Sequence, residues 1–305
     1  MIVLRRRVWV WVVALAIGGL FTGANLRAAD DKKAEQEPAT SPPPGAFTLV
    51  VMDPLALPLS CPCVKGYAQR DYEKLARHLE ARIHRTVYVA FADSLPAALA
   101  KKTSGQADLV IGKDSVVRRQ SQKAGLKLTH VAALSGLDGT TTQNGLIVVA
   151  AEDKALAVAD IKGYRIFLGP NDCDEKHLAA NNLIVDSGLE KPKNAETCSA
   201  CDEGALKILA LHNEGTKAAT VISSYAKPLL EGCGTIKKGE LRVIGETDPV
   251  PFVAAFVNEK LAPTERQLVE QALFDVVKDR ELSQALETKH GFVRPDAAKV
   301  TAKKN

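Results

Sequence analysis

The stretch that decides the fold is Phe47-Thr-Leu-Val-Val-Met52, a short apolar run rich in β-branched residues. A run of this kind predicts a buried strand. Further along the chain, the apolar residues Tyr72, Leu75 and Leu79 recur at helical spacing, which predicts a helix with one apolar face. The next run, Thr86-Val-Tyr-Val-Ala-Phe91, predicts a second strand. A strand, a helix and a strand in this order indicate parallel pairing, with the helix packed on the sheet.

The same alternation continues through most of the chain. Turn residues gather at 135–145, and Pro249-Val-Pro251 marks a second break, so we predict two crossings between two lobes. The predicted fold class is α/β, with two lobes built on mainly parallel sheets that carry helices on both faces. The predicted parts are a signal peptide at 1–28, a Pro-rich linker at 29–46, lobe 1 at 47–140 plus 252–292, lobe 2 at 146–247 and a disordered tail at 293–305.

The N-terminal residues have the order of a signal peptide. Arg5-Arg-Arg7 precedes the apolar run 8–21, and the small residues Ala28-Ala29 follow it. This run is too short to span a bilayer, which takes about 20 residues. We therefore expect an exported, periplasmic protein whose leader is cleaved, and an uncleaved N-terminal anchor stays as the alternative.

The exported part of the chain is close to neutral. Four of the 40 basic residues lie in the leader, which leaves 36 basic against 36 acidic residues. This balance argues against nucleic acid or an anionic membrane as a partner. The sequence holds no P-loop, no HExxH motif and no Ser/His/Asp arrangement, so we expect a monomeric binding protein and not an enzyme.

Three stretches together resemble a known family. They are Asp71–Glu80, Gly105–Gly112 and Asp160–Phe167, which are similar in order and spacing to the first helix, the third strand and the start of the second lobe of that family. The family is the phosphonate/phosphite/phosphate-binding periplasmic proteins that feed ABC transporters, a branch of the type II solute-binding fold. The resemblance implies a type II periplasmic-binding-protein fold that closes on a small ligand and delivers it to an inner-membrane ABC permease or to a sensor.

The chain departs from this family where the ligand is expected. The family's Ser/Thr-rich loop is replaced here by Gly169–His177, which carries Asp172, Asp174 and Glu175. Each close like-charge pair with an oxyanion costs about 1 to 4 kcal/mol, so we expect phosphonate to bind weakly or not at all and the ligand to be something other than an oxyanion. The alternative is that these acids are ordinary caps at a helix N-terminus.

Six cysteines lie in the exported part. Cys61-Pro-Cys63 follows the first strand, Cys173 follows the strand at 164–168, and Cys198-x-x-Cys201 opens a helix. Cys233, near the end of a helix, is expected to lie far from them. Five cysteines are thus predicted on loops at the cleft, where ligands of open α/β sheets bind.

Three interpretations of these cysteines stay open. Export favours disulfides, expected within one lobe, such as Cys173 with Cys198 or Cys201, because a link between lobes would lock the cleft. Thiolates with an imidazole also suit a soft metal, Cu or Zn. A thiol-redox role for Cys198 and Cys201 at a helix N-terminus is the third. The candidate metal ligands are Cys61, Cys63, Cys173, His177, Cys198 and Cys201.

We therefore predict a periplasmic, phosphonate-binding-like protein that carries a small ligand by closing its cleft, with no certain cofactor. The alternative function is an exported thiol- or metal-binding protein, for Cu or Zn, or a redox protein with a Cys-rich cleft. The candidate ligand-binding residues are Cys61, Cys63, Tyr67, Asp172, Cys173, Asp174, Cys201 and Asp202.

Overall fold

The computed structural model describes residues 41–60 and 69–295. All of them belong to one compact unit of the chain. The predicted leader, most of the linker and most of the tail lie outside the described residues, and so do Cys61, Cys63 and Tyr67. Among the residues that are described, no helix is long and apolar enough to cross a membrane.

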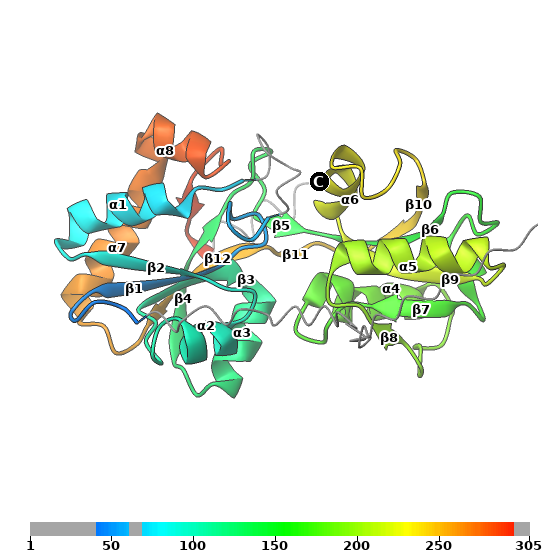
Figure 1. Cartoon of the computed structure of the whole chain (residues 1–305), viewed down its shortest axis with the longest axis horizontal. Coiled ribbons are helices and arrows are strands. Elements are labelled where there is room, and N and C mark those ends of the chain that lie inside the picture. The colour runs from blue at the N-terminus through cyan, green and yellow to red at the C-terminus, as the bar shows by residue number, and fades with distance from the viewer. Residues whose placement is uncertain (1–40, 61–68, 296–305) are drawn as a thin grey trace, which may run out of the picture. The chain divides into compact units, whose positions relative to one another are not determined.

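Lobe 1 is built on a six-stranded sheet in the order β13-β4-β12-β3-β1-β2 (Figure 1). β1 lies between β2 and β3 and is parallel to both, as predicted from the strand–helix–strand pattern. The strands are β1 (Phe47–Met52), β2 (Val87–Phe91), β3 (Leu109–Lys113), β4 (Leu128–Leu134), β12 (Val253–Asn258) and β13 (Phe292–Val293).

Lobe 2 is built on a five-stranded sheet in the order β10-β6-β9-β7-β8. The strands are β6 (Gly145–Ala150), β7 (Arg165–Leu168), β8 (Glu196–Thr197), β9 (Ala218–Ser223) and β10 (Leu241–Glu246). Of these, β8 and β10 were not predicted from the sequence.

Both sheets are mixed, whereas mainly parallel sheets were predicted. β12 returns from lobe 2 and lies between β3 and β4, antiparallel to each of them. β6 is likewise antiparallel to β9 and β10. The apolar runs of these strands resemble those of parallel strands because both of their faces are covered, so the sequence did not reveal their direction.

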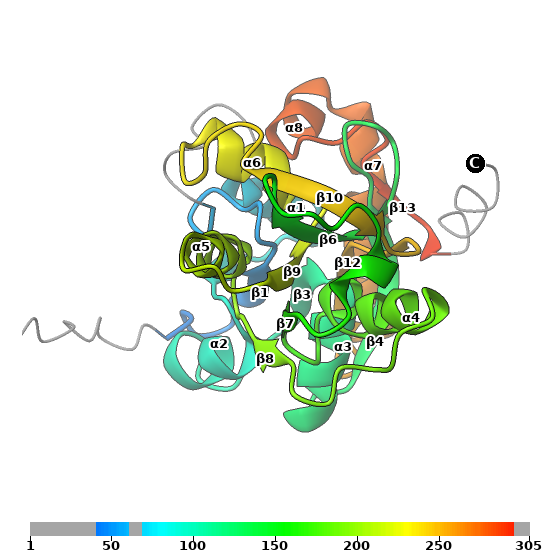
Figure 2. The ribbon, with the colours of Figure 1, turned by 90° about the vertical axis from the view of Figure 1, so that its right-hand side faces the viewer.

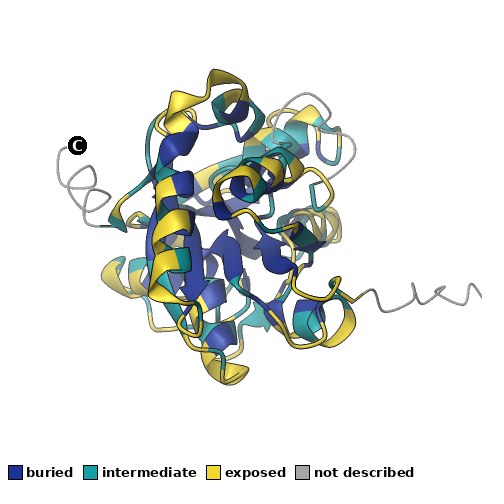
Figure 3. Cartoon of the chain, turned by 90° about the vertical axis from the view of Figure 1, so that its left-hand side faces the viewer, coloured by how far each residue is buried: buried dark blue, intermediate teal, exposed yellow. Residues whose placement is uncertain are grey.

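Helices cover both faces of the lobe 1 sheet. On one face α1 (Tyr72–Ile83) packs against α7 (Pro263–Asp275) and α8 (Arg280–Ala285). On the other face lie α2 (Leu95–Lys101) and α3 (Asp114–Lys123). The predicted apolar face of α1 is confirmed, since Tyr72, Leu75 and Leu79 are 0% exposed. Figure 3 shows buried central strands in lobe 1 and helices exposed on their outer sides.

Two helix layers cover the lobe 2 sheet as well (Figure 2). α5 (Cys201–Asn213) and α6 (Ala226–Gly232) share one apolar core with the sheet, and α4 (Leu178–Asp186) belongs to the core on the other face. A separate 3₁₀ turn, η3 (Asp174–Lys176), precedes α4, and another, η2 (Val158–Ile161), precedes β7. α6 ends at Gly232, which agrees with the helix end expected beside Cys233.

Two short strands join the lobes. β5 (Thr142–Gln143) and β11 (Val250–Pro251) pair antiparallel between the two sheets. Beside them Gly145 donates its backbone N–H to Thr247 Oγ1 over 2.8 Å, which ties the outgoing and the returning chain together.

A buried ionic network holds the chain just after β1. Asp53 is 0% exposed and accepts hydrogen bonds from Arg70 Nη1 at 2.9 Å and from the Tyr72 hydroxyl at 2.6 Å. The Arg70 guanidinium also lies over the ring of Phe252, 5.7 Å from its centre. The network therefore connects the loop after β1, the start of α1 and the returning strand beside the cleft.

Candidate ligand-binding cleft

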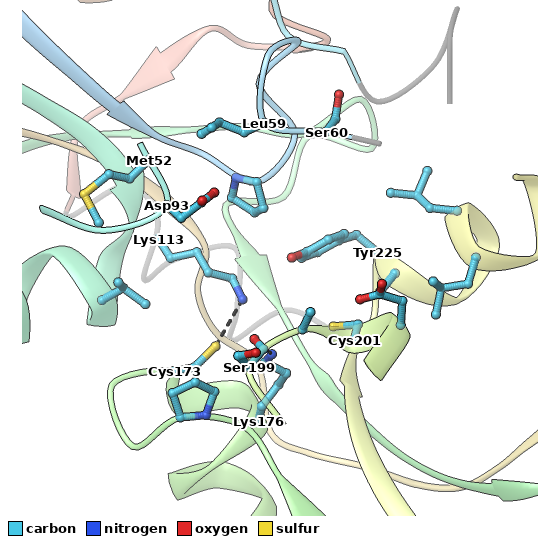
Figure 4. Close-up of a pocket in the computed structure, with 18 of the residues that line it drawn as sticks. Met52, Leu59, Ser60, Asp93, Lys113, Cys173, Lys176, Ser199, Cys201 and Tyr225 are labelled. Atoms are coloured by element: carbon cyan, nitrogen blue, oxygen red, sulfur yellow. Dashed lines mark hydrogen bonds between the residues drawn. The ribbon is translucent and has the colours of Figure 1, made fainter. Parts of the chain in front are cut away.

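A cavity of about 850 Å³ lies between residues of the two lobes (Figure 4). This volume is within the range of about 300 to 1,000 Å³ that is typical of sites for small organic molecules. Lobe 1 contributes the ends of β1 and β3 and the first turns of α3. Lobe 2 contributes the loop 170–176, the start of α5, and one side of α6 with the residues just after it. The site thus lies at the carboxyl ends of strands, as expected for an open α/β sheet.

Lys113, the last residue of β3, is buried at the centre of this cavity. Its ammonium donates to Glu175 Oε1 of lobe 2, to Cys173 Sγ at 3.2 Å and to Ser223 Oγ at 3.3 Å. The ion pair with Glu175 therefore joins the two lobes inside the protein.

One carboxylate oxygen of Glu175, Oε1, receives three hydrogen bonds. Its carboxylate is 1% exposed and accepts from the Ser223 hydroxyl at 2.7 Å and from the Cys173 thiol at 3.2 Å, besides Lys113. Burial alone would raise the pKa of Glu175, but the charge of Lys113 and these hydrogen bonds outweigh it and lower the pKa below its usual value. Glu175 is therefore ionised at neutral pH.

Tyr225 forms the aromatic wall of the cavity. Its ring stacks on Phe252 with a centroid separation of 5.2 Å, and Lys113 Nζ lies 5.5 Å from its centre. Burial raises the pKa of the phenol. The Tyr225 hydroxyl makes no hydrogen bond to any described residue, and Figure 4 shows it inside the cavity. It is thus available to a ligand.

A second set of contacts between the lobes runs from α3 to the loop 171–174. Ser115 Oγ donates to the Asp172 carbonyl at 2.8 Å and accepts from the Asp174 backbone N–H at 3.1 Å. Arg119 pairs with the Asp174 carboxylate at 2.5 Å, and the Gln120 amide donates to the Asp172 carboxylate at 2.9 Å. The structure is therefore a closed arrangement of the two lobes.

Comparison with known families decides what kind of cleft this is. A family model described as the periplasmic substrate-binding protein of phosphonate ABC transporters matches residues 66–300. The chain belongs to this family. It is a phosphonate-binding-like periplasmic substrate-binding protein of ABC transporters. A search of curated protein sequences gave no match.

Solved structures show the same fold. A binding protein component of an ABC phosphonate transporter from Pseudomonas aeruginosa is 13% identical, with a TM-score of 0.62 over 85% of this chain and 89% of that one. PhnD1 from Prochlorococcus marinus, in complex with methylphosphonate, is 13% identical, with a TM-score of 0.61 over 85% and 96%. A Xanthomonas citri protein bound to ATP is 12% identical, with a TM-score of 0.61 over 85% and 95%.

The structure brings together part of the predicted ligand set of this family member. Asp172, Cys173, Cys201 and Asp202 all line the cavity. Asp174 does not line it, because its carboxylate turns to Arg119 on the lobe 1 side. Cys61, Cys63 and Tyr67 fall outside the described residues.

The acids expected to repel an oxyanion have different surroundings. Glu175 is neutralised by Lys113 and Asp174 by Arg119, both from the opposite lobe. Asp172 has only the neutral amide of Gln120 as a side-chain partner among the described residues. The sequence interpretation counted three free charges, whereas two of them are paired across the cleft.

The predicted disulfides are absent among the four described cysteines, which are all free thiols. Cys173 faces Lys113 and Glu175, and Cys201 faces Ser223, with 3.4 Å from its sulfur to the Ser223 backbone nitrogen. Cys198 is buried in the lobe 2 core. Their thiols therefore have other partners. Cys233, expected to lie far from the site, lines the cavity.

The predicted metal site is not supported within the described ranges. No group of three or more His, Cys, Asp or Glu side chains there is arranged to hold a metal ion. His177 contacts the Gly169 carbonyl through Nδ1 at 3.0 Å and does not line the cavity. The candidates Cys173 and Cys201 lie next to Lys113 and Ser223, and an ammonium beside a thiol takes the place that a cation would need.

Sequence reasoning missed Lys113, Ser223 and Tyr225. A signal for Lys113 and Ser223 existed, because Lys113 directly follows the apolar run at 107–112, and Ser223 follows the apolar run at 218–222. The rule that ligands bind at the carboxyl ends of strands applies to these positions as it does to the cysteine loops. The abundance of cysteines drew the prediction to the other strand ends.

We expect Gly145→Ala to destabilise the protein by pushing on the backbone of Glu175. An alanine Cβ at this position would lie 2.0 Å from the Glu175 carbonyl oxygen, which is backbone and cannot rotate away. The substitution should lower the free energy of unfolding by about 2 kcal/mol, the usual cost of overpacking. Urea denaturation measures it, with Gly136→Ala as the control, because its Cβ would approach the rotatable Asp138 carboxylate at 2.8 Å and meet backbone, the Thr140 carbonyl oxygen, only at 3.8 Å. Equal stability of the two variants would contradict this close approach.

Proposed function

We propose that this chain binds one small organic solute in the cleft between its lobes and presents it to the permease of an ABC transporter. The observation that carries the proposal is a cavity whose walls come from both lobes, in a member of this family. A solute that contacts both lobes stabilises the closed form by its difference in affinity for the two forms. A permease that recognises the closed form then responds to the presence of solute. We propose further that the mature chain acts as a periplasmic monomer after removal of its leader.

The cavity favours a solute with a polar end and an apolar body. Ser199, Cys201 and Asp202, at the start of α5, offer polar groups. The ring of Tyr225 and the side chains of Leu229 and Leu230 offer an apolar surface next to them. Such a lining, mostly apolar with a few placed polar groups, is typical of sites for organic molecules.

We propose a binding role without catalysis. Cys173 is one nucleophile that lines the cleft, and burial raises the pKa of its thiol to about 11. A thiol that stays protonated at neutral pH is a weak nucleophile, since the thiolate is the reactive form. This supports a cleft that holds its ligand unchanged.

Thermal unfolding with a panel of solutes tests the proposal. The panel contains alkylphosphonates, alkylsulfonates, amino acids and organic amines. A solute that binds only the folded chain stabilises it by about 2.7 kcal/mol at a hundred times its Kd, which raises the melting temperature by several degrees. Tyr225→Ala should remove that rise, whereas Leu206→Ala, at an exposed position of α5, should keep it. A rise that survives in Tyr225→Ala would place the binding site elsewhere and refute the proposal.

A further inference from the structure

We infer that Glu175 determines the specificity of the cleft: its carboxylate occupies the place of a ligand's anionic group, so the wild-type cleft rejects free phosphonate-type anions. The inference rests on the proposed function, because it concerns which solutes that same cleft accepts. Four observations support the inference. They concern the hydrogen-bond donors of Lys113, the hydrogen bonds of Glu175, the fixed backbone of Glu175 and the charge at the rim of the cavity.

The first observation is that Lys113 has no donor left for a ligand. An ammonium has three N–H groups. Those of Lys113 are directed to Glu175, Cys173 and Ser223, all of them in lobe 2. The strongest cationic group at the centre of the cavity is thus already neutralised by the chain itself.

The second observation is that Glu175 Oε1 receives the donors that the anionic group of a ligand would use. Its carboxylate accepts from an ammonium of one lobe and from a hydroxyl and a thiol of the other. It is 1% exposed, so water does not compete for these donors. A ligand anion at this position would use the same donors and would have to displace Glu175 first.

The third observation is that Glu175 has little freedom to withdraw. Its backbone lies so close to Gly145 that an added Cβ there would be 2.0 Å from its carbonyl oxygen. The neighbouring Asp174 is bound to Arg119 and Ser115 of the opposite lobe. The loop is therefore fixed on both sides of the side chain.

The fourth observation is the charge of the cavity rim. Asp93, Asp172 and Asp202 line the cavity and repel an incoming anion. The second lining cation, Lys176, is buried and donates to the Ser199 carbonyl at 3.3 Å. With Lys113 neutralised, the carboxylates outnumber the cations that face the cavity.

Calorimetric titration with methylphosphonate tests the inference on the full mature chain. Glu175→Gln keeps the size of the side chain and removes its charge, which leaves Lys113 to pair with the added anion. We expect the affinity for methylphosphonate to rise by about a hundredfold over the wild type, since a charge-assisted hydrogen-bonded pair contributes on the order of 3 kcal/mol. Thermal melting of each variant shows that it is folded, and Glu175→Ser provides a second variant with a hydroxyl at the position.

Two control variants separate this effect from a general change of charge. Asp174→Asn removes the same charge one residue earlier, but its partner Arg119 does not line the cavity as Lys113 does, so methylphosphonate binding should change less than threefold. Lys113→Met combined with Glu175→Gln removes the cation as well, so the gain should disappear.

The outcomes distinguish this inference from the proposed function. Tight binding of methylphosphonate by the wild type overturns the inference and leaves the proposed function standing. Failure of both folded Glu175 variants to bind methylphosphonate more tightly also overturns it, while a solute of the panel that stabilises the wild type through Tyr225 still supports the proposed function. A gain in Glu175→Gln that Asp174→Asn does not share supports the inference.

Discussion

We expect Asp53→Ala to lower the free energy of unfolding by about 3 to 5 kcal/mol, the usual result of removing one partner of a buried ion pair. Asp53 is 0% exposed and its partner Arg70 is 3% exposed. Without Asp53 the guanidinium stays buried with no carboxylate beside it, and the Tyr72 hydroxyl loses its acceptor. Urea denaturation of the mature chain measures the loss.

Two further variants serve as controls for this prediction. Asp138→Ala changes an exposed carboxylate near the lobe crossing and should cost less than about 1 kcal/mol. Tyr72→Phe removes only the hydroxyl and should cost about 1 kcal/mol. If Asp53→Ala is no less stable than Asp138→Ala, the network does not hold the loop after β1 in place.

We expect Lys113→Met to reverse the pH dependence of stability that Glu175 causes. In the wild type the pKa of Glu175 lies below its ordinary value, so its contribution is present at neutral pH and is lost as the pH falls through that lowered pKa. In the variant Glu175 is still buried but has no cation beside it, so burial raises its pKa. The charged form is then disfavoured, so the variant gains stability as the pH falls from 7 towards 5.

The size of the effect at neutral pH should be about 3 to 5 kcal/mol for Lys113→Met, or less where the lobes open and let water reach Glu175. Of the groups that contact Glu175, Cys173 has a raised pKa and Ser223 does not titrate, and the nearby Tyr225 also has a raised pKa. Denaturation curves at several pH values measure the slope. The matched control is the double variant with Glu175→Gln, in which this slope should vanish. A single variant that loses stability on acidification, as the wild type does, would contradict the assignment.

Sequence reasoning predicted those features that depend on local spacing. The apolar face of α1 followed from the repeat of Tyr72, Leu75 and Leu79, because helical periodicity is a local property. The placement of Asp172, Cys173 and Cys201 at the cavity followed from the rule on strand ends. Strand direction did not follow, since β12 pairs across a sequence separation that no local pattern encodes.

The chemistry of the cleft could not be predicted because it depends on partners from opposite lobes. Lys113 and Glu175 are separated by 62 positions and meet only when the two lobes come together. The sequence showed an acidic loop, which was expected to repel an anionic ligand. That expectation left out the positive charges of Lys113 and Arg119, which lie in lobe 1 and pair with two of the acids. Cys173 and Cys201 were given disulfide or metal roles for the same reason, since their neighbours in the structure are an ammonium, a carboxylate and a hydroxyl.

The central claim is that the chain's own Lys113–Glu175 pair joins the lobes where a ligand anion would otherwise stand. Small-angle X-ray scattering of the mature chain, without solute and then with methylphosphonate, tests it most directly. The account predicts a wild-type radius of gyration that methylphosphonate leaves unchanged, and a Glu175→Gln variant that becomes more compact when the anion is added. A wild type that is open alone and closes on methylphosphonate would contradict the claim.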